Sequence, residues 1–200
     1  HWSMVTSTRS GLVSTDSVGK DLFELKKKRG RPTELRNSTT DSLGSFVANK
    51  LHLNGLVTNV SAECSGSIHA LYTASAISLS QQQPVIVFCA DNLVDDAMQM
   101  WRFSSMGALD QSSGRAFEST SAGLRMGRGM VAMLVKHPSV KFNMSAFATI
   151  SNYIFRTNPK LIANPGDAHQ LARDISGINF DTIDFWNAHA TGTPVGDQFE

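Results

Sequence analysis

The chain has 200 residues, of which 41% are hydrophobic and 18% charged, and its formal net charge is +1. Such a composition is typical of a globular chain with enough apolar side chains for a core. A charge so close to zero gives no overall field that would favour nucleic acid or an anionic membrane. Cys64 and Cys89 provide no disulfide framework, so we expect a reducing, cytoplasmic location. The longest apolar run, 130–135, is far shorter than the roughly 20 residues of a membrane helix.

Before residue 40 the sequence predicts a strand, a short helix and a loop. Residues 5–12 combine β-branched side chains with a glycine, which predicts a strand running into a loop. Residues 20–25 are expected to form a short helix. Residues 26–40 are so polar that we expect a surface loop there.

The spacing of four apolar side chains predicts a helix after residue 40. They fall on one helical face: Leu43, Phe46, Val47 and Leu51. We expect this helix to begin near Thr40 or Asp41 and to stop by Gly55. Residues 56–61 then predict a strand that ends at the segment of Cys64.

The middle of the chain predicts buried elements. Residues 65–80 contain no proline, and small or apolar side chains occupy most sides of the helix that they would form. This pattern indicates a buried helix, ended by Pro84. Residues 85–90 predict a buried strand, and residues 93–106 predict a second helix.

The remaining elements complete an alternating pattern. The second helix is expected to be capped by Asp91 or Asn92. Three strands are predicted after it, over 130–137 behind the Gly127/Gly129 turn, over 142–150 and over 182–189. A helix over 167–176 is expected to end at Gly177. Strands that alternate with helices indicate an α/β fold with a largely parallel, buried sheet.

Cys64 lies where a strand is expected to end and a helix to begin. A thiol at that point faces backbone N–H groups and the positive end of the helix dipole, which favours the thiolate. Small neighbours allow a substrate to approach: Ser61, Ala62, Ser65, Gly66 and Ser67. The alternative is that Cys64 is a small buried apolar residue, as free cysteines usually are.

Three other residues could take part in chemistry or in the core. His189 ends the last predicted strand and precedes a Gly/Thr turn, which suits a residue working in a cleft, although a loop histidine with a satisfied hydrogen bond is the alternative. His69 follows Cys64 by about 500° of helical rotation, so we expect a structural role for it. Cys89 is expected to be a core residue of its strand.

Three ordered segments resemble those of the β-ketoacyl synthases, the condensing enzymes of fatty-acid and polyketide assembly. NVSAECSGSIHAL resembles their nucleophile segment, and HATGTPVGDQFE is similar to their His-Gly-Thr-Gly-Thr signature, with its Asp and Glu at Asp197 and Glu200. Residues 107–135 resemble the intervening family stretch, which ends in a Gly-Glu-Gly turn and a strand. The chain is therefore identified as an internal fragment of a divergent member of this family.

The resemblance implies a thiolase-like fold, an α/β architecture with two similar halves layered αβαβα, of which this chain holds only part. Residues 1–135 would form the later part of the first half, including the nucleophile segment. Residues 136–200 would begin the second half, with the His-x-Thr-Gly-Thr motif. The family's second active-site histidine, its lysine and its gating loop would lie outside this chain.

The resemblance also implies a decarboxylative Claisen condensation. Cys64 would take an acyl group from a carrier-protein thioester, and its backbone N–H would help to hold the oxyanion. His189 would stabilise the enolate of the malonyl unit, while Thr191 and Thr193 would hydrogen-bond the phosphopantetheine arm. No metal or redox cofactor is needed. The implied partners are an acyl carrier protein and a second subunit, in a homodimer or a ketosynthase heterodimer.

Three positions depart from the family pattern. Glu63 stands directly before Cys64, where alanine is usual, and its carboxylate would disfavour a thiolate unless it is paired or turned away. Ala190 replaces the first glycine of the signature, which matters if that backbone needs a positive φ. Arg128 replaces the glutamate of Gly-Glu-Gly.

Two further features have a structural and a functional interpretation. Phe103 and Phe117 are candidates to line an acyl tunnel, with Phe117 placed among the substrate-binding residues; the alternative is that both are core aromatics. The segment KRGRP at 28–32 copies the core of an AT-hook, which binds a narrow A·T-rich minor groove. It occurs once in a near-neutral chain. We instead expect the cations in this segment and directly before it to help attract an acidic carrier protein: Lys26, Lys27, Lys28, Arg29 and Arg31.

Three alternatives to an active condensing enzyme stay open. A non-catalytic, chain-length-factor type of partner subunit would fit Glu63 and Arg128, whereas retention of Cys64 and His189 favours the enzyme. A DNA-binding module would lose affinity steeply with salt. A thiol hydrolase with a Cys–His pair would not depend on a carrier protein.

Overall fold

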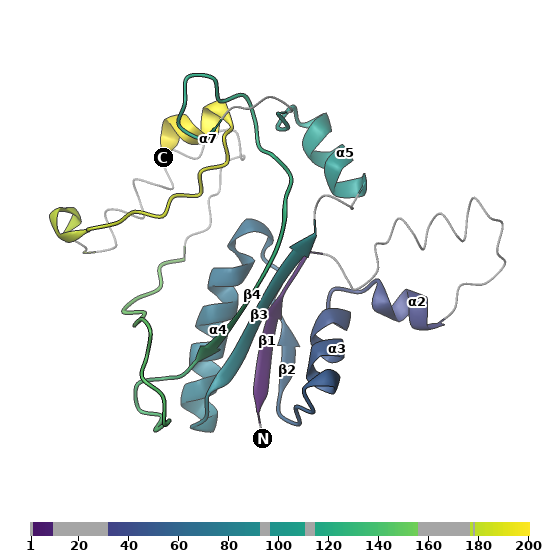
Figure 1. Ribbon diagram of the computed structural model, residues 1–200, viewed down its shortest axis with the longest axis vertical. Helices are drawn as coiled ribbons and strands as arrows, with labels where there is room; N and C mark the ends of the chain where they lie inside the picture. Colours follow the sequence, from purple (N-terminus) through teal and green to yellow (C-terminus); the bar gives the residue numbers. More distant parts are fainter. Residues whose placement is uncertain (1, 10–31, 93–96, 111–114, 156–176, 178) are drawn as a thin grey trace. The chain divides into compact units, whose positions relative to one another are not determined.

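The computed structural model describes residues 2–9, 32–92, 97–110, 115–155, 177 and 179–200 (Figure 1). They belong to two compact units, the first His1–Met100 with Gly127–Ala146, the second Trp101–Met126 with Phe147–Glu200. The helices predicted over 20–25 and 167–176, and the cations at 26–29 and 31, lie outside the described residues. None of the helices in the described part of the chain is long and apolar enough to cross a membrane.

The first unit is built on a four-stranded sheet with the order β2-β1-β3-β4. The central strand β1 (Ser3–Ser7) pairs in parallel with β2 (Val57–Asn59) and with β3 (Val85–Asn92). β4 (Arg128–Val135) pairs with β3 in the antiparallel direction. The four strands are confirmed, and the prediction of a largely parallel sheet holds for all but this edge strand.

Helix α2 (Pro32–Asn37) corrects the prediction that residues 26–40 form only a loop. Pro32 occupies the first helical position, where its missing N–H leaves no hydrogen bond unmade and its fixed φ suits the helix. Pro32, Thr33 and Arg36 of α2 are exposed, as a polar sequence requires, whereas Asn37 at its end is half-buried.

Helix α3 (Ser42–Lys50) is confirmed and begins after Asp41, but the face of the four apolar side chains is not its buried face. Its buried residues are small ones: Ser42, Gly44 and Ala48. Phe46 and Leu51 are 48% and 54% exposed. A Cβ built on Gly44 would lie 3.0 Å from Oγ1 of Thr6 in β1, so this face brings the helix backbone close to the sheet. Close packing has favoured the small face over the more apolar one.

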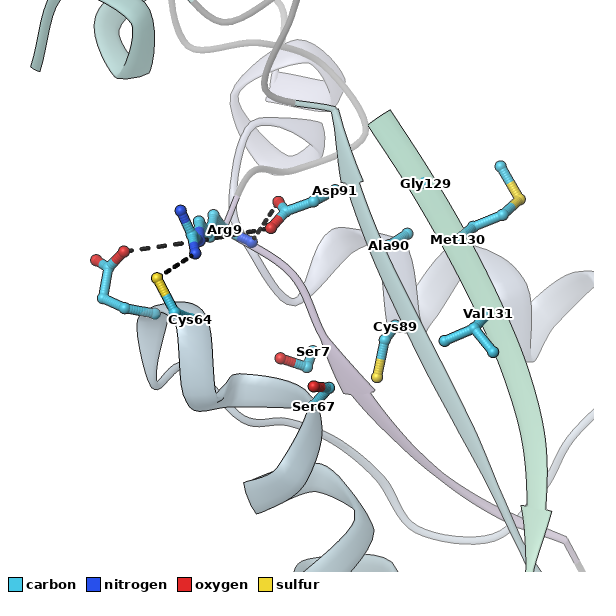
Figure 2. Close-up of a pocket in the computed structure, with 11 residues that line it drawn as sticks. Ser7, Arg9, Cys64, Ser67, Cys89, Ala90, Asp91, Gly129, Met130 and Val131 are labelled. Carbon is cyan, nitrogen blue, oxygen red and sulfur yellow. Dashed lines mark hydrogen bonds and ion pairs between the residues drawn. The ribbon is translucent and has the colours of Figure 1, made fainter. Parts of the chain in front are cut away.

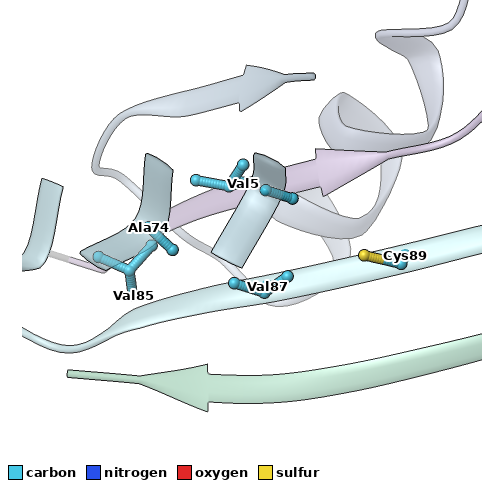
Figure 3. Close-up of a cluster of buried hydrophobic side chains, with 6 residues drawn as sticks. Val5, Ala74, Val85, Val87 and Cys89 are labelled. Carbon is cyan, nitrogen blue, oxygen red and sulfur yellow. The ribbon is translucent and has the colours of Figure 1, made fainter. Parts of the chain in front are cut away.

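Helix α4 (Gly66–Gln81) covers the other face of β1. Successive side chains of a strand point to opposite faces, and Val5 packs with α4 whereas Thr6 faces α3. The buried stripe of α4 recurs every four residues: Gly66, Ala70, Ala74 and Ser78. Together with the strands it forms one core cluster (Figure 3), made of Val5, Ala70, Ala74, Val85, Val87 and Cys89.

The prediction that α4 is buried on most sides is wrong for this chain. Ile68, Tyr72 and Leu79 are exposed, because the described residues place a sheet against only one side of the helix. The helix ends at Gln81, where Gln82 takes a left-handed backbone conformation ahead of Pro84. The second predicted helix is α5 (Ala97–Ser105). Asp91 and Asn92 belong to β3, so their prediction as helix caps is wrong.

Beyond α5, the second unit contains two short helical segments in its described part, the 3₁₀ helix η3 (Phe180–Thr182) and α7 (Pro194–Phe199). The strand predicted over 182–189 is not formed, and neither is the one predicted over 142–150. Phe147 and Phe185 are exposed in these stretches. A strand needs a partner for its backbone groups, and an apolar sequence pattern alone does not provide one.

Candidate active site

Cys64 lies at the predicted junction between a strand and a helix. β2 ends at Asn59, the 3₁₀ turn η2 (Glu63–Ser65) follows, and α4 begins at Gly66. The turn is tight, with φ of Glu63 at +46°. A Cβ on Gly66 would collide with the hydroxyl of Ser7, so glycine lets α4 start close to β1. The cysteine side chain is exposed, which excludes the interpretation of Cys64 as a buried apolar residue.

A pocket of about 300 Å³ opens beside Cys64 at the carboxyl ends of β1 and β3 (Figure 2). Ser7 and Ser67 line it near the helix start, and the antiparallel strand β4 contributes Met130 and Val131 on the far side. The pocket therefore joins a polar side next to the thiol to an apolar side along β4. This arrangement suits a ligand with a polar reacting group and an apolar chain.

Arg9, just beyond β1, reaches the sulfur of Cys64. Its Nη2 donates a hydrogen bond to Sγ at 3.0 Å. Its Nε lies 3.7 Å from a carboxylate oxygen of Glu63 and 3.5 Å from one of Asp91. The backbone N–H of Arg9 also donates to Asp91, at 3.2 Å. Glu63 is thus paired with a cation. An unpaired carboxylate beside Cys64 would disfavour the thiolate, and this pairing reduces that effect.

Sequence reasoning missed Arg9. No motif contains it, and 55 positions separate it from Cys64. The one available signal was topological, because residues that follow parallel strands meet at the same edge of a sheet. Arg9 follows β1 at the edge where η2 and the end of β3 also lie.

The two other residues weighed near Cys64 have the structural roles predicted for them. Cys89 is buried in β3 and belongs to the core cluster, although it also borders the pocket. Burial raises the pKa of its thiol, and a backbone hydrogen bond with Ser7 offsets part of that rise. The His69 ring nitrogen Nδ1 lies 3.0 Å from the backbone oxygen of Ser65, the residue directly before its helix.

In the second unit, Glu200 fixes the backbone around His189. The N–H of His189 donates to one carboxylate oxygen at 2.6 Å, and the N–H of Ala190 donates to the other at 2.7 Å. Ala190 has φ of +50°, so the position at which the family signature carries glycine does require a left-handed backbone. The imidazole of His189 belongs to an exposed residue.

The two threonines of the signature contact each other. Their hydroxyl oxygens lie 2.9 Å apart. Thr193 is also the N-cap of α7, where its hydroxyl accepts the N–H of Gly196 at 3.2 Å. Thr191 and Thr193 therefore form a pair of polar groups at the start of a helix, next to the histidine in sequence.

Asp197 ties this turn to the segment of Phe117. Its carboxylate accepts the N–H of Phe117 at 2.7 Å, the N–H of Gly192 at 3.0 Å and the hydroxyl of Ser121 at 2.8 Å. These donors, the Phe117 N–H foremost, hold the pKa of Asp197 below its ordinary value of 3.8. Phe117 is 54% exposed and borders a second pocket of about 370 Å³, so it is not a core aromatic.

The structure thus brings the predicted residues together in two groups. Cys64 lies in the first unit with Arg9, and His189, Thr191, Thr193 and Phe117 lie in the second unit. The joint action of Cys64 and His189 in one reaction, which the family resemblance implies, stays a prediction. Arg128, the third departure from the family pattern, is the exposed first residue of β4. Among the residues described, no cluster of His, Cys, Asp or Glu could hold a metal ion.

Comparison with known families settles the resemblance. The N-terminal domain of β-ketoacyl synthases matches residues 4–140, and the C-terminal domain of the same enzymes matches residues 148–200. The chain belongs to the β-ketoacyl synthase family. The identification made from the three sequence segments is therefore confirmed.

Curated relatives of this ketosynthase chain include polyketide synthases. It is 31% identical to the cluster 41 polyketide synthase of Aspergillus flavus over an alignment 199 residues long, which covers 94% of this chain and 18% of that protein. It is 26% identical to the 6-methylsalicylic acid synthase of Penicillium expansum over an alignment 164 residues long, which covers 77% of this chain and 9% of the relative. The chain thus spans less than a fifth of the length of either relative.

A solved ketosynthase shares the fold. The chain superposes on a ketosynthase from Xenorhabdus doucetiae, solved in complex with its chain length factor, with a TM-score of 0.55 and 18% identity. The likeness covers 66% of this chain and 33% of that one. The predicted thiolase-like α/β fold, present here in part, is confirmed.

Proposed function

We propose that the protein to which this chain belongs is a β-ketoacyl synthase that catalyses decarboxylative Claisen condensation in polyketide or fatty-acid assembly. The observation that carries the proposal is the position of Cys64 in a member of this family. Its thiol is exposed at a strand-to-helix turn, borders a pocket and lies 3.0 Å from a guanidinium. Relatives named as polyketide synthases favour a polyketide product over an ordinary fatty acid.

The reaction has two steps at the same sulfur. In the first, the Cys64 thiolate attacks the carbonyl carbon of an acyl thioester, a C–S bond forms to Cys64, and the carrier's sulfur leaves and takes up a proton. In the second, a malonyl thioester loses carbon dioxide. Its enolate carbon then attacks the acyl-Cys64 carbonyl, a C–C bond forms, and the Cys64 thiolate is released.

Each site residue has a role in this scheme. The backbone N–H of Cys64 contributes to the hole that holds the oxyanion. His189 stabilises the enolate, and Thr191 and Thr193 hydrogen-bond the phosphopantetheine arm. Phe117 contacts the acyl chain, which its exposed ring and the neighbouring pocket support. The scheme requires no metal and no redox cofactor.

The proposed partners are an acyl carrier protein and a second synthase subunit. Lys26, Lys27, Lys28, Arg29 and Arg31 would steer an acidic carrier protein towards the site. The second subunit completes a homodimer or a heterodimer, and the Xenorhabdus ketosynthase, solved with its chain length factor, supports the heterodimer. We propose a cytoplasmic location, in keeping with two reduced cysteines.

The intact mass of the full-length protein tests the proposal. After incubation with an acyl carrier protein, we expect a mass gain of one acyl group, which Cys64→Ala removes and Cys89→Ala leaves in place. Cys64→Ala should also abolish chain elongation. No gain in mass, either alone or with a candidate partner subunit, would contradict the enzymatic role and favour the non-catalytic partner subunit.

A further inference from the structure

Arg9 is held at Cys64 from three different elements. The guanidinium extends from the end of β1 to the sulfur at 3.0 Å, and Asp91 in β3 pairs with it (Figure 2). Glu63 in η2 pairs with the same guanidinium. Its side chain is only 14% exposed, although Glu63 is 67% exposed. A long cation that is mostly shielded from solvent and pairs with two carboxylates has little freedom to leave the sulfur.

The charges around the sulfur can be set out element by element. The segment after β1 contributes the cation Arg9, η2 contributes Glu63, and β3 contributes Asp91 together with the buried thiol of Cys89. β4 lines the same pocket with uncharged residues only, Gly129, Met130 and Val131, and α4 lines it with Ser67. Arg9 is thus the one cation among the described residues that line this pocket.

We propose that Arg9 is the counter-ion that keeps the Cys64 sulfur as a thiolate, and that Glu63 and Asp91 fix its guanidinium against the sulfur. The inference rests on the proposed function in one respect, because that thiolate is the acyl acceptor. It accounts for a carboxylate at position 63, next to a nucleophile: Glu63 and Arg9 compensate each other. A charged donor directly at a thiol lowers the free energy of the anion, whereas the N–H groups of a helix start supply only partial charges.

The rate of alkylation of Cys64 by iodoacetamide, followed in the full-length protein as a function of pH, tests this role without any carrier protein. The sulfur displaces iodide, the thiol proton goes to solvent, and peptide masses identify the modified cysteine. Two unit charges at this separation change the thiolate equilibrium by about tenfold even in water. We expect Arg9→Gln to slow alkylation at neutral pH by about tenfold and to move the pH profile about one unit higher.

Three variants separate charge from structure. Arg9→Lys retains the cation and should keep most of the wild-type rate. Arg36→Gln, which removes an exposed cation of α2, should change nothing. Glu63→Ala added to Arg9→Gln should restore part of the lost rate, because it removes the carboxylate left unpaired beside the sulfur. Should Arg9→Gln fail to fold, its combination with Asp91→Asn removes the charge of the second carboxylate beside residue 9 and carries the same expectation.

The outcomes decide the inference. A raised pH profile in Arg9→Gln but not in Arg9→Lys supports it. An unchanged profile in a folded Arg9→Gln variant overturns it, and so does an equal shift in the Gln and Lys variants, which would indicate a structural effect. If the profile shifts as expected but Cys64 is never acylated, the counter-ion role stands and the proposed function fails.

Discussion

Replacing Asp197 with asparagine should loosen the link between the segment of Phe117 and the turn at Gly192. One carboxylate oxygen of Asp197 accepts the N–H of Phe117 at 2.7 Å, and the other accepts the N–H of Gly192 at 3.0 Å. An asparagine amide offers one acceptor oxygen and one NH₂ donor in place of two acceptor oxygens. Whichever way that amide lies, its NH₂ faces one of the two backbone N–H groups, and that hydrogen bond is lost.

The size of the effect follows from the charge on the acceptor. A hydrogen bond to a charged group contributes about 1.5–3 kcal/mol. We take the lower end of that range, about 1.5 kcal/mol, because the carboxylate is only half-buried and is screened by water. This corresponds to an increase of roughly tenfold in local opening at the two amides.

Hydrogen exchange read by mass spectrometry in the full-length protein measures this opening. Peptides that contain residues 117 and 192 should exchange about tenfold faster in Asp197→Asn than in the wild type at neutral pH. A peptide over β3 should be unchanged. Asp184→Asn, which alters an exposed aspartate of the same unit, is the matched control. Equal exchange in the wild type and Asp197→Asn at neutral pH would refute the reasoning.

The same experiment has an expected pH dependence. The pKa of Asp197 is lowered in the folded protein, so its contribution is complete above the ordinary value of 3.8. It is lost as the pH falls through the lowered value, because protonation removes the charge that the donors stabilise. The difference between wild type and Asp197→Asn should therefore shrink in acid, and a difference that grew there would contradict the assignment.

The remaining predictions concern cysteine labelling and the turn after His189. Because Cys64 is exposed whereas burial raises the pKa of Cys89, a short iodoacetamide pulse at neutral pH should label Cys64 and spare Cys89; equal labelling of both in folded protein would contradict this. Ala190→Gly relieves a left-handed backbone strain of about 1–2 kcal/mol in the folded state. Glycine also gives the unfolded chain more conformational freedom, which offsets about 0.5–1 kcal/mol of that gain. The net stabilisation should slow hydrogen exchange at residues 189–193 about two- to fivefold. Ala62→Gly, at a position where φ is −144°, relieves no left-handed strain and should not slow exchange. Faster exchange in Ala190→Gly would show that the alanine conformation is unstrained.

Local sequence was sufficient for two of the elements that line the pocket beside Cys64. The β-branched run of β3 and the small residues at the start of α4 specify their structure through side-chain shape, which acts within a few positions of the chain. Helix α7 was not predicted, although the cap at Thr193 and the proline at the first helical position are local signals for it. Ordered motifs, read together, then specified the family.

Tertiary contacts decided the rest. Which face of α3 is buried depended on how closely Gly44 approaches Thr6, and helical periodicity carries no information about that distance. Residues 142–150 and 182–189 have strand-like composition. A strand forms only beside a partner strand, and composition does not show whether a partner is present. The sequence by itself determined where the thiol lies along the chain and which turn presents it. Only the fold decided that Arg9 reaches it, because the order in which strands join a sheet brings distant residues to one edge.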